Sequence, residues 1–288
     1  MKNRAKIPTC CCNPVSNTRS SDTKREIRKR YGELAKSATA DTCCTKDSVT
    51  EQAGYTEEEL QQLPDKASAA SAGCGNPTAL AGLKKGETVL DLGSGGGIDV
   101  FLAAKKVGST GLVIGVDMTP EMIDLARENA EKGKISNVEF RLGEIEHLPV
   151  ADGTVDVIIS NCVISLSTQK EQVFKEAYRV LKKRGRLLVS DMMVKGIPDE
   201  VRRNLSLWAS CIGGAIELEA YTDAIRKAGF TKIEVVNNTE YSLETIKGWI
   251  TSMEEDMDKK EREELKKLKH AVEDNIKVSH AEISAVKV

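Results

Sequence analysis

The sequence predicts an α/β protein built on a doubly wound, mostly parallel β-sheet. From Gly86 onward, short apolar segments with strand character alternate with segments of helical character. A glycine-rich turn, Gly93–Gly97, lies between the first expected strand and the first expected helix of this region. A segment of helix and loop precedes this core, and we expect a smaller α+β region after it.

The expected elements follow the chain in order. One helix begins after Ser21 or Asp22, and a short helix covers Glu57–Leu63. The core strands are Thr88–Leu92, Leu112–Val116, Val138–Leu142, Val155–Ser160 and Arg186–Ser190. The core helices are Ile98–Lys106, Pro120–Glu131 (with Thr119 as its N-cap) and Gln169–Leu181. Beyond Asp199 we expect helices at Val201–Ile212, Leu218–Ala228 and 254–275, and strands at Ile233–Val236 and Ala281–Val288.

Composition limits the class of protein. The 288 residues allow one large domain with a smaller appendage, and 40% of them are hydrophobic, enough for a sizeable core. The net charge of -2 argues against a basic face for nucleic acid. No apolar run is long enough to cross a bilayer, and the N-terminus does not resemble a signal peptide. We therefore expect a cytoplasmic monomer without nucleic-acid or membrane partners, whose eight cysteines are mostly reduced.

Four regions are expected along the chain. Residues 1–21 form a flexible tail that contains Cys10, Cys11 and Cys12, for which a role in metalloid capture is a less favoured alternative. Residues 22–78 form a helix and a long segment of the kind that often serves as a lid or binding segment. Residues 79–195 form the core, and residues 196–288 contribute Cys211 and the last strands.

The glycine turn is the first candidate binding site. Gly93, Gly95 and Gly97 let the backbone approach a ligand closely, and free amides at the helix start can meet a carboxylate or phosphate. Asp117 ends the second expected strand, where an acid can accept hydrogen bonds from both ribose hydroxyls. A tight structural turn is the simpler alternative. The strand, turn, helix and downstream acid together predict a cofactor that contains adenosine.

The position of Asp91 selects among such cofactors. A dinucleotide site prefers the spacing G-x-G-x-x-G, which this turn with Ser94 and three consecutive glycines lacks. Asp91 precedes the turn, and a carboxylate there would repel a pyrophosphate but attract the ammonium group of an amino acid. The sequence therefore favours S-adenosylmethionine.

Three cysteines suggest the substrate. Cys162 follows a core strand at its carboxyl end, where ligands of such sheets bind, so it should lie near the methyl donor. Cys74 lies between two glycines, and Cys211 precedes Gly213 and Gly214. Each could be an inert buried thiol. If the three converge, they present soft sulfur ligands that suit trivalent arsenic, whose lone pair could attack the methyl group of a sulfonium.

The motifs resemble those of class I methyltransferases, which have a Rossmann-like fold. Asp91, Gly93, Gly95 and Gly97 match the first motif of that superfamily, and Asp117 matches its ribose-binding acid. The chain more closely resembles the microbial arsenite methyltransferase family from about Tyr31 to Tyr241. The matching segments are Gly73–Pro77, Leu90–Gly97, Gly115–Thr119 (with Met118), Gly143–Glu146, Ser160–Val163 and Trp208–Cys211.

The resemblance implies roles for particular residues. It implies that Gly143, Glu144 and Ile145 face the adenine, and that Asn161 lies close to the sulfonium. It implies that Cys74, Cys162 and Cys211 bind arsenic, and that either Cys43 or Cys44 joins the catalytic cycle. Cysteine disulfides formed while oxidised arsenic is reduced would be reopened by thioredoxin or a small thiol. The sequence departs from the family at Ser165 and at Lys183-Arg184, which replaces a common Pro-Gly turn.

Two other functions stay open. The chain could methylate a small organic molecule such as a quinone precursor, or it could bind metalloids without catalysis. Tyr31 is a further candidate for the cofactor site, because the N-terminal helix can fold over it as a lid. His147, His270 and His280 are scattered along the sequence, and we expect them at the surface.

Overall fold

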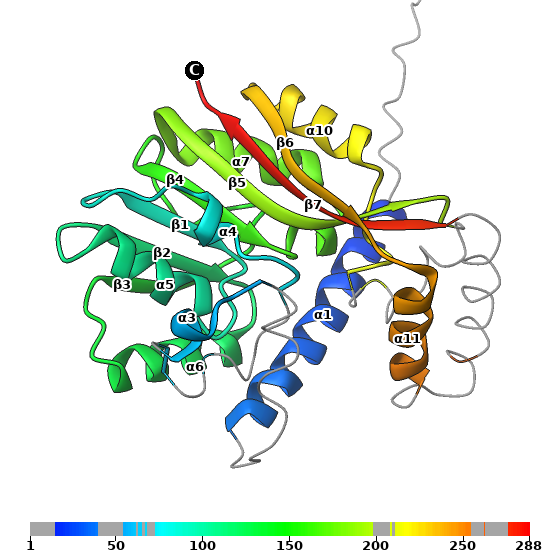
Figure 1. The fold of residues 1–288 in the computed structure, drawn as a ribbon, viewed down its shortest axis with the longest axis horizontal. Helices are drawn as coiled ribbons and strands as arrows, with labels where there is room; N and C mark the ends of the chain where they lie inside the picture. Colours follow the sequence, from blue (N-terminus) through cyan, green and yellow to red (C-terminus); the bar gives the residue numbers. More distant parts are fainter. Residues whose placement is uncertain are drawn as a thin grey trace, which may run out of the picture.

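The structure is a computed structural model that describes residues 15–39, 54–61, 63–64, 67, 73–197, 208, 211–254, 262 and 276–288. Its centre is a seven-stranded sheet in the order β3-β2-β1-β4-β5-β7-β6 (Figure 1). The strands are β1 (Thr88–Leu92), β2 (Leu112–Asp117), β3 (Val138–Leu142), β4 (Val155–Asn161), β5 (Leu181–Lys195), β6 (Thr231–Glu240) and β7 (Lys277–Val286). The first five are parallel, and β7 runs antiparallel to both β5 and β6. The predicted doubly wound α/β fold is confirmed.

Helices cover both faces of the sheet. The described helices are α1 (Val15–Thr39), α3 (Glu57–Gln61), α4 (Pro77–Leu80), α5 (Ile98–Val107), α6 (Pro120–Lys132), the short 3-10 helix η2 (Ile164–Leu166), α7 (Lys170–Val180), α10 (Leu218–Lys227) and α11 (Leu243–Glu254). Apolar residues of α5 and α6 pack on one face, and those of α7 and α10 pack on the other. β1 and β4 are almost wholly buried, as expected for central parallel strands covered on both sides.

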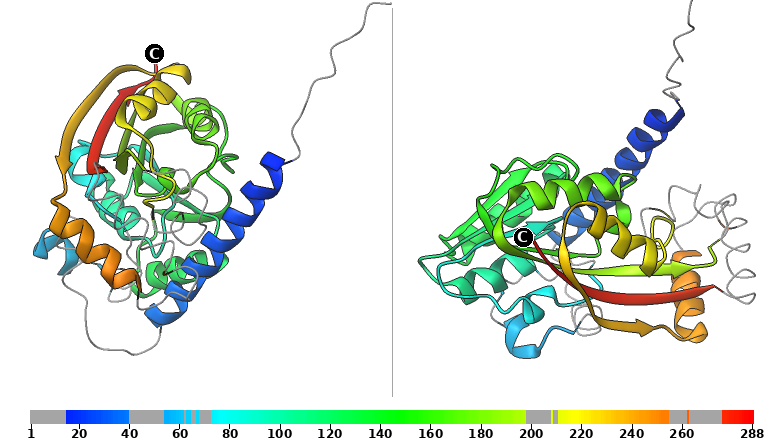
Figure 2. Two further views of the ribbon diagram at one scale, coloured as in Figure 1. Left: turned by 90° about the vertical axis from the view of Figure 1, so that its right-hand side faces the viewer. Right: turned by 90° about the horizontal axis from the view of Figure 1, so that it is seen from above.

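The long helix α1 crosses the molecule beside α6 (Figures 1 and 2). Ala35 and Ala38 of α1 pack against Met122 and Leu125 of α6. This packing places the C-terminal part of α1 beside α6, which follows directly on the carboxyl end of β2. The expected N-terminal helix is therefore present, and its role as a lid stays a prediction.

Several sequence predictions were wrong at the ends of the chain. α1 begins at Val15 rather than after Ser21, and the rest of the expected tail lies outside the described residues. α11 was not predicted. Cys211 and Ile212 are not helical, whereas the remainder of the expected helix Val201–Ile212 lies outside the described residues apart from Trp208. The expected helix 254–275 lies outside them too, except for Glu254 and Arg262.

The C-terminal region is not a separate unit. β7 pairs with β5 over ten positions, from Arg186–Val286 to Lys195–Lys277, and β6 pairs with β7. The two C-terminal strands therefore extend the core sheet. This arrangement also buries His280, which is 8% exposed, so its expected surface position was wrong. None of the helices in the described part of the chain is both long enough and apolar enough to span a membrane.

Candidate active site

The glycine turn folds as its sequence suggests. The backbone amides of Gly93 and Ser94 both donate to the carbonyl of Val116, at 2.8 and 3.1 Å, which ties the turn to the end of β2. Gly93, Gly95 and Gly97 have φ of 70, 50 and 98°, in the left-handed region that favours glycine. A Cβ atom at Gly93 would also overlap the side chain of Val163. Backbone conformation therefore favours glycine at all three positions, and close packing adds to this requirement at Gly93.

Asp117 joins the glycine turn to the start of α6. One of its carboxylate oxygens accepts a hydrogen bond from the amide of Gly95 at 3.0 Å, and the other accepts one from the amide of Thr119 at 2.8 Å. Thr119 occupies the predicted N-cap position, but its side chain makes no capping hydrogen bond. Asp117 thus lies where the turn and the helix meet, with lone pairs left on both oxygens for further donors.

Buried carboxyl groups give this region a preference for cations. Asp91 is 2% and Asp99 is 7% exposed. Burial, with smaller contributions from Asp99 and Asp117, raises the pKa of Asp91 well above its usual value. Burial raises the pKa of Asp99 to about 6, although hydrogen bonds from Asn161 and Tyr55 oppose the shift. Burial also raises the pKa of Asp117. A positively charged ligand would relieve this desolvation by pairing with the carboxylates.

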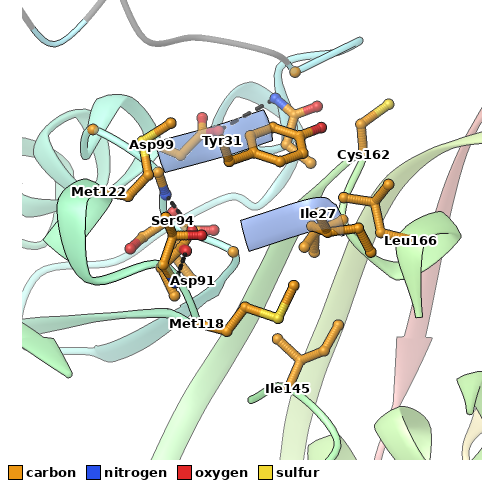
Figure 3. A pocket seen from close by; sticks show the side chains of 18 of the residues that line it. Ile27, Tyr31, Asp91, Ser94, Asp99, Met118, Met122, Ile145, Cys162 and Leu166 are labelled. Atoms are coloured by element: carbon orange, nitrogen blue, oxygen red, sulfur yellow. Dashed lines mark hydrogen bonds between the residues drawn. The ribbon is translucent and has the colours of Figure 1, made fainter. Parts of the chain in front are cut away.

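These groups line a cavity that runs from the glycine turn to a cysteine. It holds about 990 Å³ of space outside protein atoms, including space open to solvent. Figure 3 shows Asp91, Ser94 and Asp99 on one side and Cys162 on the other. The predicted site residues in its lining are Tyr31, Asp91, Gly93, Ser94, Gly95, Asp117, Met118, Ile145, Asn161 and Cys162.

Other predicted cofactor residues lie outside the lining. Gly97 is the N-cap of α5, where a Cβ atom would lie 2.7 Å from the ring of Phe101. Gly143 packs against Pro149. Glu144 is occupied by ion pairs to Lys24 at 2.7 Å and Arg28 at 2.6 Å. Direct contact of these three residues with a cofactor stays a prediction, and the structure gives each of them a supporting contact instead.

Charged groups hold α1 over the cavity. Besides its pair with Glu144, Lys24 contacts Glu146 at 3.2 Å, and the Glu146 side chain is only 3% exposed. Arg28 donates to the carbonyl of Met118 at 3.3 Å. Ile27 and Tyr31, which follow Lys24 and Arg28 by three residues each, reach into the cavity (Figure 3). α1 therefore closes one side of the cavity through contacts that its sequence pattern did not reveal.

The three predicted cysteines lie together. Cys74 and Cys162 are joined by a disulfide, with Cα atoms 5.9 Å apart. The thiol of Cys211 donates to the carbonyl of Cys162 at 3.3 Å, and it lies 4.0 Å from the hydroxyl of Tyr31. Folding thus brings the Cα atoms of Cys74 and Cys162 within disulfide range, whereas Cys211 is a free thiol. The expectation that the eight cysteines are mostly reduced stays a prediction. Cys10, Cys11, Cys12, Cys43 and Cys44 lie outside the described residues.

Two of these cysteines have a left-handed backbone conformation. Cys162 and Cys211 have φ of 56 and 69°, which costs a side chain other than glycine about 1 kcal/mol. Such strain is typical of functional sites. Burial, and then the charge of Asp191, raises the pKa of the Cys211 thiol to about 12. Among the described residues, no group of three or more His, Cys, Asp and Glu side chains is arranged to hold a metal ion. Arsenic binding by these cysteines stays a prediction.

Asn161 has a role that the sequence did not reveal. Its carbonyl oxygen accepts hydrogen bonds from the amides of Cys74 and Gly75, at 2.9 and 3.1 Å, and its amide donates to the carbonyl of Gly75 at 2.6 Å. A Cβ atom at Gly73 would overlap this side chain. Asn161 therefore holds the loop that carries Cys74, and its expected contact with the cofactor stays a prediction.

Asp99 and Tyr55 line the cavity but were missed by sequence reasoning. The Tyr55 hydroxyl donates to both carboxylate oxygens of Asp99, at 3.0 and 2.9 Å, and accepts a hydrogen bond from Asn161 at 3.0 Å. Asp99 could have been suspected, since it is a lone acid between Ile98 and Val100 in an otherwise apolar helix start. Tyr55 carries no comparable signal, because it reaches the cavity from a distant segment.

The residues of the cavity suit S-adenosylmethionine. This cofactor carries a positively charged sulfonium and an ammonium group, which match the buried carboxylates of Asp91 and Asp99. The hydroxyl of Ser94 is buried and has no hydrogen-bond partner among the residues that the structure describes, so a ligand could provide one. The donor set, the charge and the glycine turn thus agree with the cofactor that the sequence predicts.

Comparison with known proteins identifies the class. A family model described as a methyltransferase domain matches residues 83–273. Phosphoethanolamine N-methyltransferase 2 of Haemonchus contortus, solved with S-adenosyl-L-methionine, shares the fold with a TM-score of 0.55. It is 22% identical and covers 75% of this chain and 53% of its own. The chain therefore belongs to the methyltransferase-domain family and has the S-adenosylmethionine-dependent methyltransferase fold.

Two relatives narrow the family further. The chain is 42% identical to the arsenite methyltransferase of Halobacterium salinarum over 253 residues, or 82% of this chain and 64% of that protein. An arsenic(III) S-adenosylmethionine methyltransferase from Chlamydomonas reinhardtii has a TM-score of 0.61 and 31% identity, covering 85% of this chain and 75% of its own. Within the methyltransferases, the chain is a member of the arsenite methyltransferase family. It spans 64% of the length of the curated relative from Halobacterium.

Proposed function

We propose that this protein transfers methyl groups from S-adenosylmethionine to trivalent arsenic held by cysteine sulfurs. The observation that carries the proposal is the cavity, which connects the acidic glycine turn to Cys162 (Figure 3). Cys74 is bonded to Cys162, and Cys211 contacts its carbonyl group. The site therefore combines a cation-binding cradle with soft sulfur ligands, as methylation of arsenic requires.

Capture of arsenite begins with reduction of the disulfide. Thioredoxin or a small thiol is the proposed reductant, because thiol exchange is the general route by which protein disulfides open. Each cysteine thiol that binds then gives its proton to a hydroxide of arsenite, which leaves as water. Cys211 enters this exchange as a protonated thiol, since its pKa is raised to about 12.

Alignment and exclusion of water are the main tasks of the protein in methyl transfer. When bound, S-adenosylmethionine supplies an electrophilic methyl group on a positively charged sulfur. The arsenic lone pair needs no general base, because it carries no proton. Asp91 and Asp117 are proposed to orient the cofactor, and Ile27 and Tyr31 of α1 exclude water from the cavity that they line.

A redox step follows from the electron balance. Arsenic would give its lone pair to the new methyl bond and become pentavalent, while the electron pair of the broken S–CH₃ bond would stay on the sulfur of the leaving S-adenosylhomocysteine. Two thiolates then supply one electron each, join as a disulfide, and return the arsenic to the trivalent state. The bonded pair Cys74–Cys162 corresponds to such an oxidised form. By the family resemblance, Cys43 or Cys44 is a further proposed participant, and the external thiol restores the reduced cysteines.

The test is speciation of arsenic by mass spectrometry after incubation with arsenite, S-adenosylmethionine and a thiol reductant. We expect methylated arsenicals from the native chain and none from Cys162→Ser, which should still bind the cofactor. The triple change of Cys10, Cys11 and Cys12 to Ser controls for general loss of thiols and should keep activity. Arsenite binding without consumption of the cofactor would instead indicate a metalloid-binding protein, and full activity of Cys162→Ser would refute the role of Cys162.

A further inference from the structure

A buried pair of polar side chains lies beneath the loop that carries Cys74. The hydroxyl of Ser190 on β5 and the Nε2 atom of His280 on β7 are 2.6 Å apart. Ser190 is 1% and His280 is 8% exposed. His280 belongs to the strand between β5 and β6, opposite Met192 on one side and Thr239 on the other. The proposed chemistry uses neither side chain, although both lie against the loop of Cys74.

The pair makes direct contact with the backbone next to Cys74. A Cβ atom at Gly75 would overlap the hydroxyl of Ser190 and would lie 2.7 Å from Nε2 of His280. Gly75 therefore packs closely against these two side chains, which leave no room for a larger residue at this position. The side chain of Asn161 binds the same glycine through its amide and its carbonyl. The loop thus contacts both Asn161 and the Ser190–His280 pair.

Ser190 also contacts the segment that carries Cys162. Its carbonyl accepts a hydrogen bond from the amide of Cys162 at 2.8 Å, and its residue pairs with Asn161 in the register of β4 and β5. Ser190 therefore contacts both cysteine-bearing segments. Its backbone carbonyl binds Cys162, and its side chain lies against Gly75, next to Cys74. The hydroxyl of Ser190 is in turn hydrogen-bonded to the His280 ring.

We propose that Ser190 and His280 are a positioning pair that sets the distance between the sulfur atoms of Cys74 and Cys162. His280 acts through Ser190, and Ser190 acts through Gly75. Two thiols that are held close together bind one trivalent arsenic far more tightly than two that move independently. The reason is that a nearby thiol has a higher effective concentration when the second arsenic–sulfur bond forms. The inference rests on the proposed function only in its choice of a trivalent arsenical as ligand, because the thiol spacing can be measured without any methyl transfer.

The test uses phenylarsine oxide, a trivalent arsenical that binds two thiols. The protein is the full chain, reduced, with Cys10, Cys11, Cys12, Cys43 and Cys44 replaced by Ser so that these thiols do not compete. In this background His280→Ala should weaken binding of phenylarsine oxide on the order of tenfold and leave the affinity for S-adenosylmethionine unchanged. His280→Gln should restore binding, because its side-chain amide can still meet the hydroxyl of Ser190. His147→Ala, at an exposed histidine, is the matched control.

A double-mutant cycle separates positioning from a general effect on the fold. If His280 acts on Cys74, His280→Ala should add nothing in a Cys74→Ser background. Ser190→Ala should reproduce the loss if His280→Ala does not fold. Unchanged binding in both variants would overturn the proposal, as would a parallel loss of arsenical and cofactor binding. Failure of the native chain to methylate arsenite, with the His280 effect intact, would instead refute the proposed function and leave the positioning pair standing.

Discussion

Replacing Asp99 with Asn should change how the stability of the protein depends on pH. Asp99 is buried in the first turn of α5 and receives hydrogen bonds from Tyr55 and Asn161. Burial raises its pKa from 3.8 to about 6 in the folded protein. In the unfolded chain the same carboxyl group titrates near its ordinary value. As the pH rises, the unfolded state therefore loses this proton first, and the free energy of unfolding falls until the folded state has lost it too.

The size of the effect follows from the two pKa values. The difference of roughly two units corresponds to about 3 kcal/mol when both states are ionised. By about pH 5 roughly half of this loss has already occurred, because the unfolded carboxyl group is mostly ionised there. Between about pH 5 and about pH 7.5 the native chain should lose about 1.5 kcal/mol that Asp99→Asn does not lose.

The assay is denaturant unfolding of both proteins at the two pH values, without added cofactor and under one set of redox conditions. The quantity compared is the difference in unfolding free energy between variant and native chain, which should shift in favour of the variant at the higher pH. Asp124→Asn, at a solvent-exposed aspartate on α6, controls for simple loss of charge. A difference for Asp99→Asn that stays constant across this range would refute the argument that burial perturbs this carboxyl group.

Three further predictions concern the lid, the glycine turn and a strained surface position. Lys24→Met leaves the buried carboxylate of Glu146 without this ion pair, so calorimetry should show about tenfold weaker binding of S-adenosylmethionine. Lys29→Met, at an exposed lysine of the same helix, should bind normally. Gly93→Ala would force a Cβ atom into Val163 at a left-handed φ, and we expect a loss of about 2 kcal/mol or more in unfolding free energy together with loss of cofactor binding. Arg184→Gly relieves a left-handed φ of 64° on the surface and should raise the melting temperature, with a gain of up to about 1 kcal/mol. A lower melting temperature for Arg184→Gly would show that the conformation is not strained.

Local sequence was sufficient for the features that depend on near neighbours. The turn from Gly93 to Gly97 was predictable because left-handed backbone and close packing leave few residue types other than glycine. The parallel strands were predictable because burial on both faces produces short apolar runs, as in Val155–Asn161. The start of α6 was predictable from Thr119 and Pro120, although the side chain of Thr119 proved not to cap the helix.

Features that depend on distant segments were harder to predict. The burial of His280 follows from its place on β7, the strand between β5 and β6. This pairing brings His280 to Ser190, which lies 90 residues earlier in the chain. Tyr55 reaches Asp99 from a segment before the core, and no periodicity in the sequence indicates this contact. The pairs of Lys24 with Glu144 and Glu146 likewise depend on where α1 crosses the sheet.

The cysteines show where the two sources of information divide. By itself the sequence determined that Cys162 follows a core strand at its carboxyl end, that Cys74 lies between glycines, and that an adenosine cofactor with a positive charge suits the turn between Asp91 and Asp117. The tertiary structure decided that Cys74, Cys162 and Cys211 lie together and that Asn161, Ser190 and His280 contact the loop of Cys74. The physical reason is that a turn or a strand is selected by the residues within it, whereas the distance between two thiols is set by the packing of separate segments, which no local pattern records.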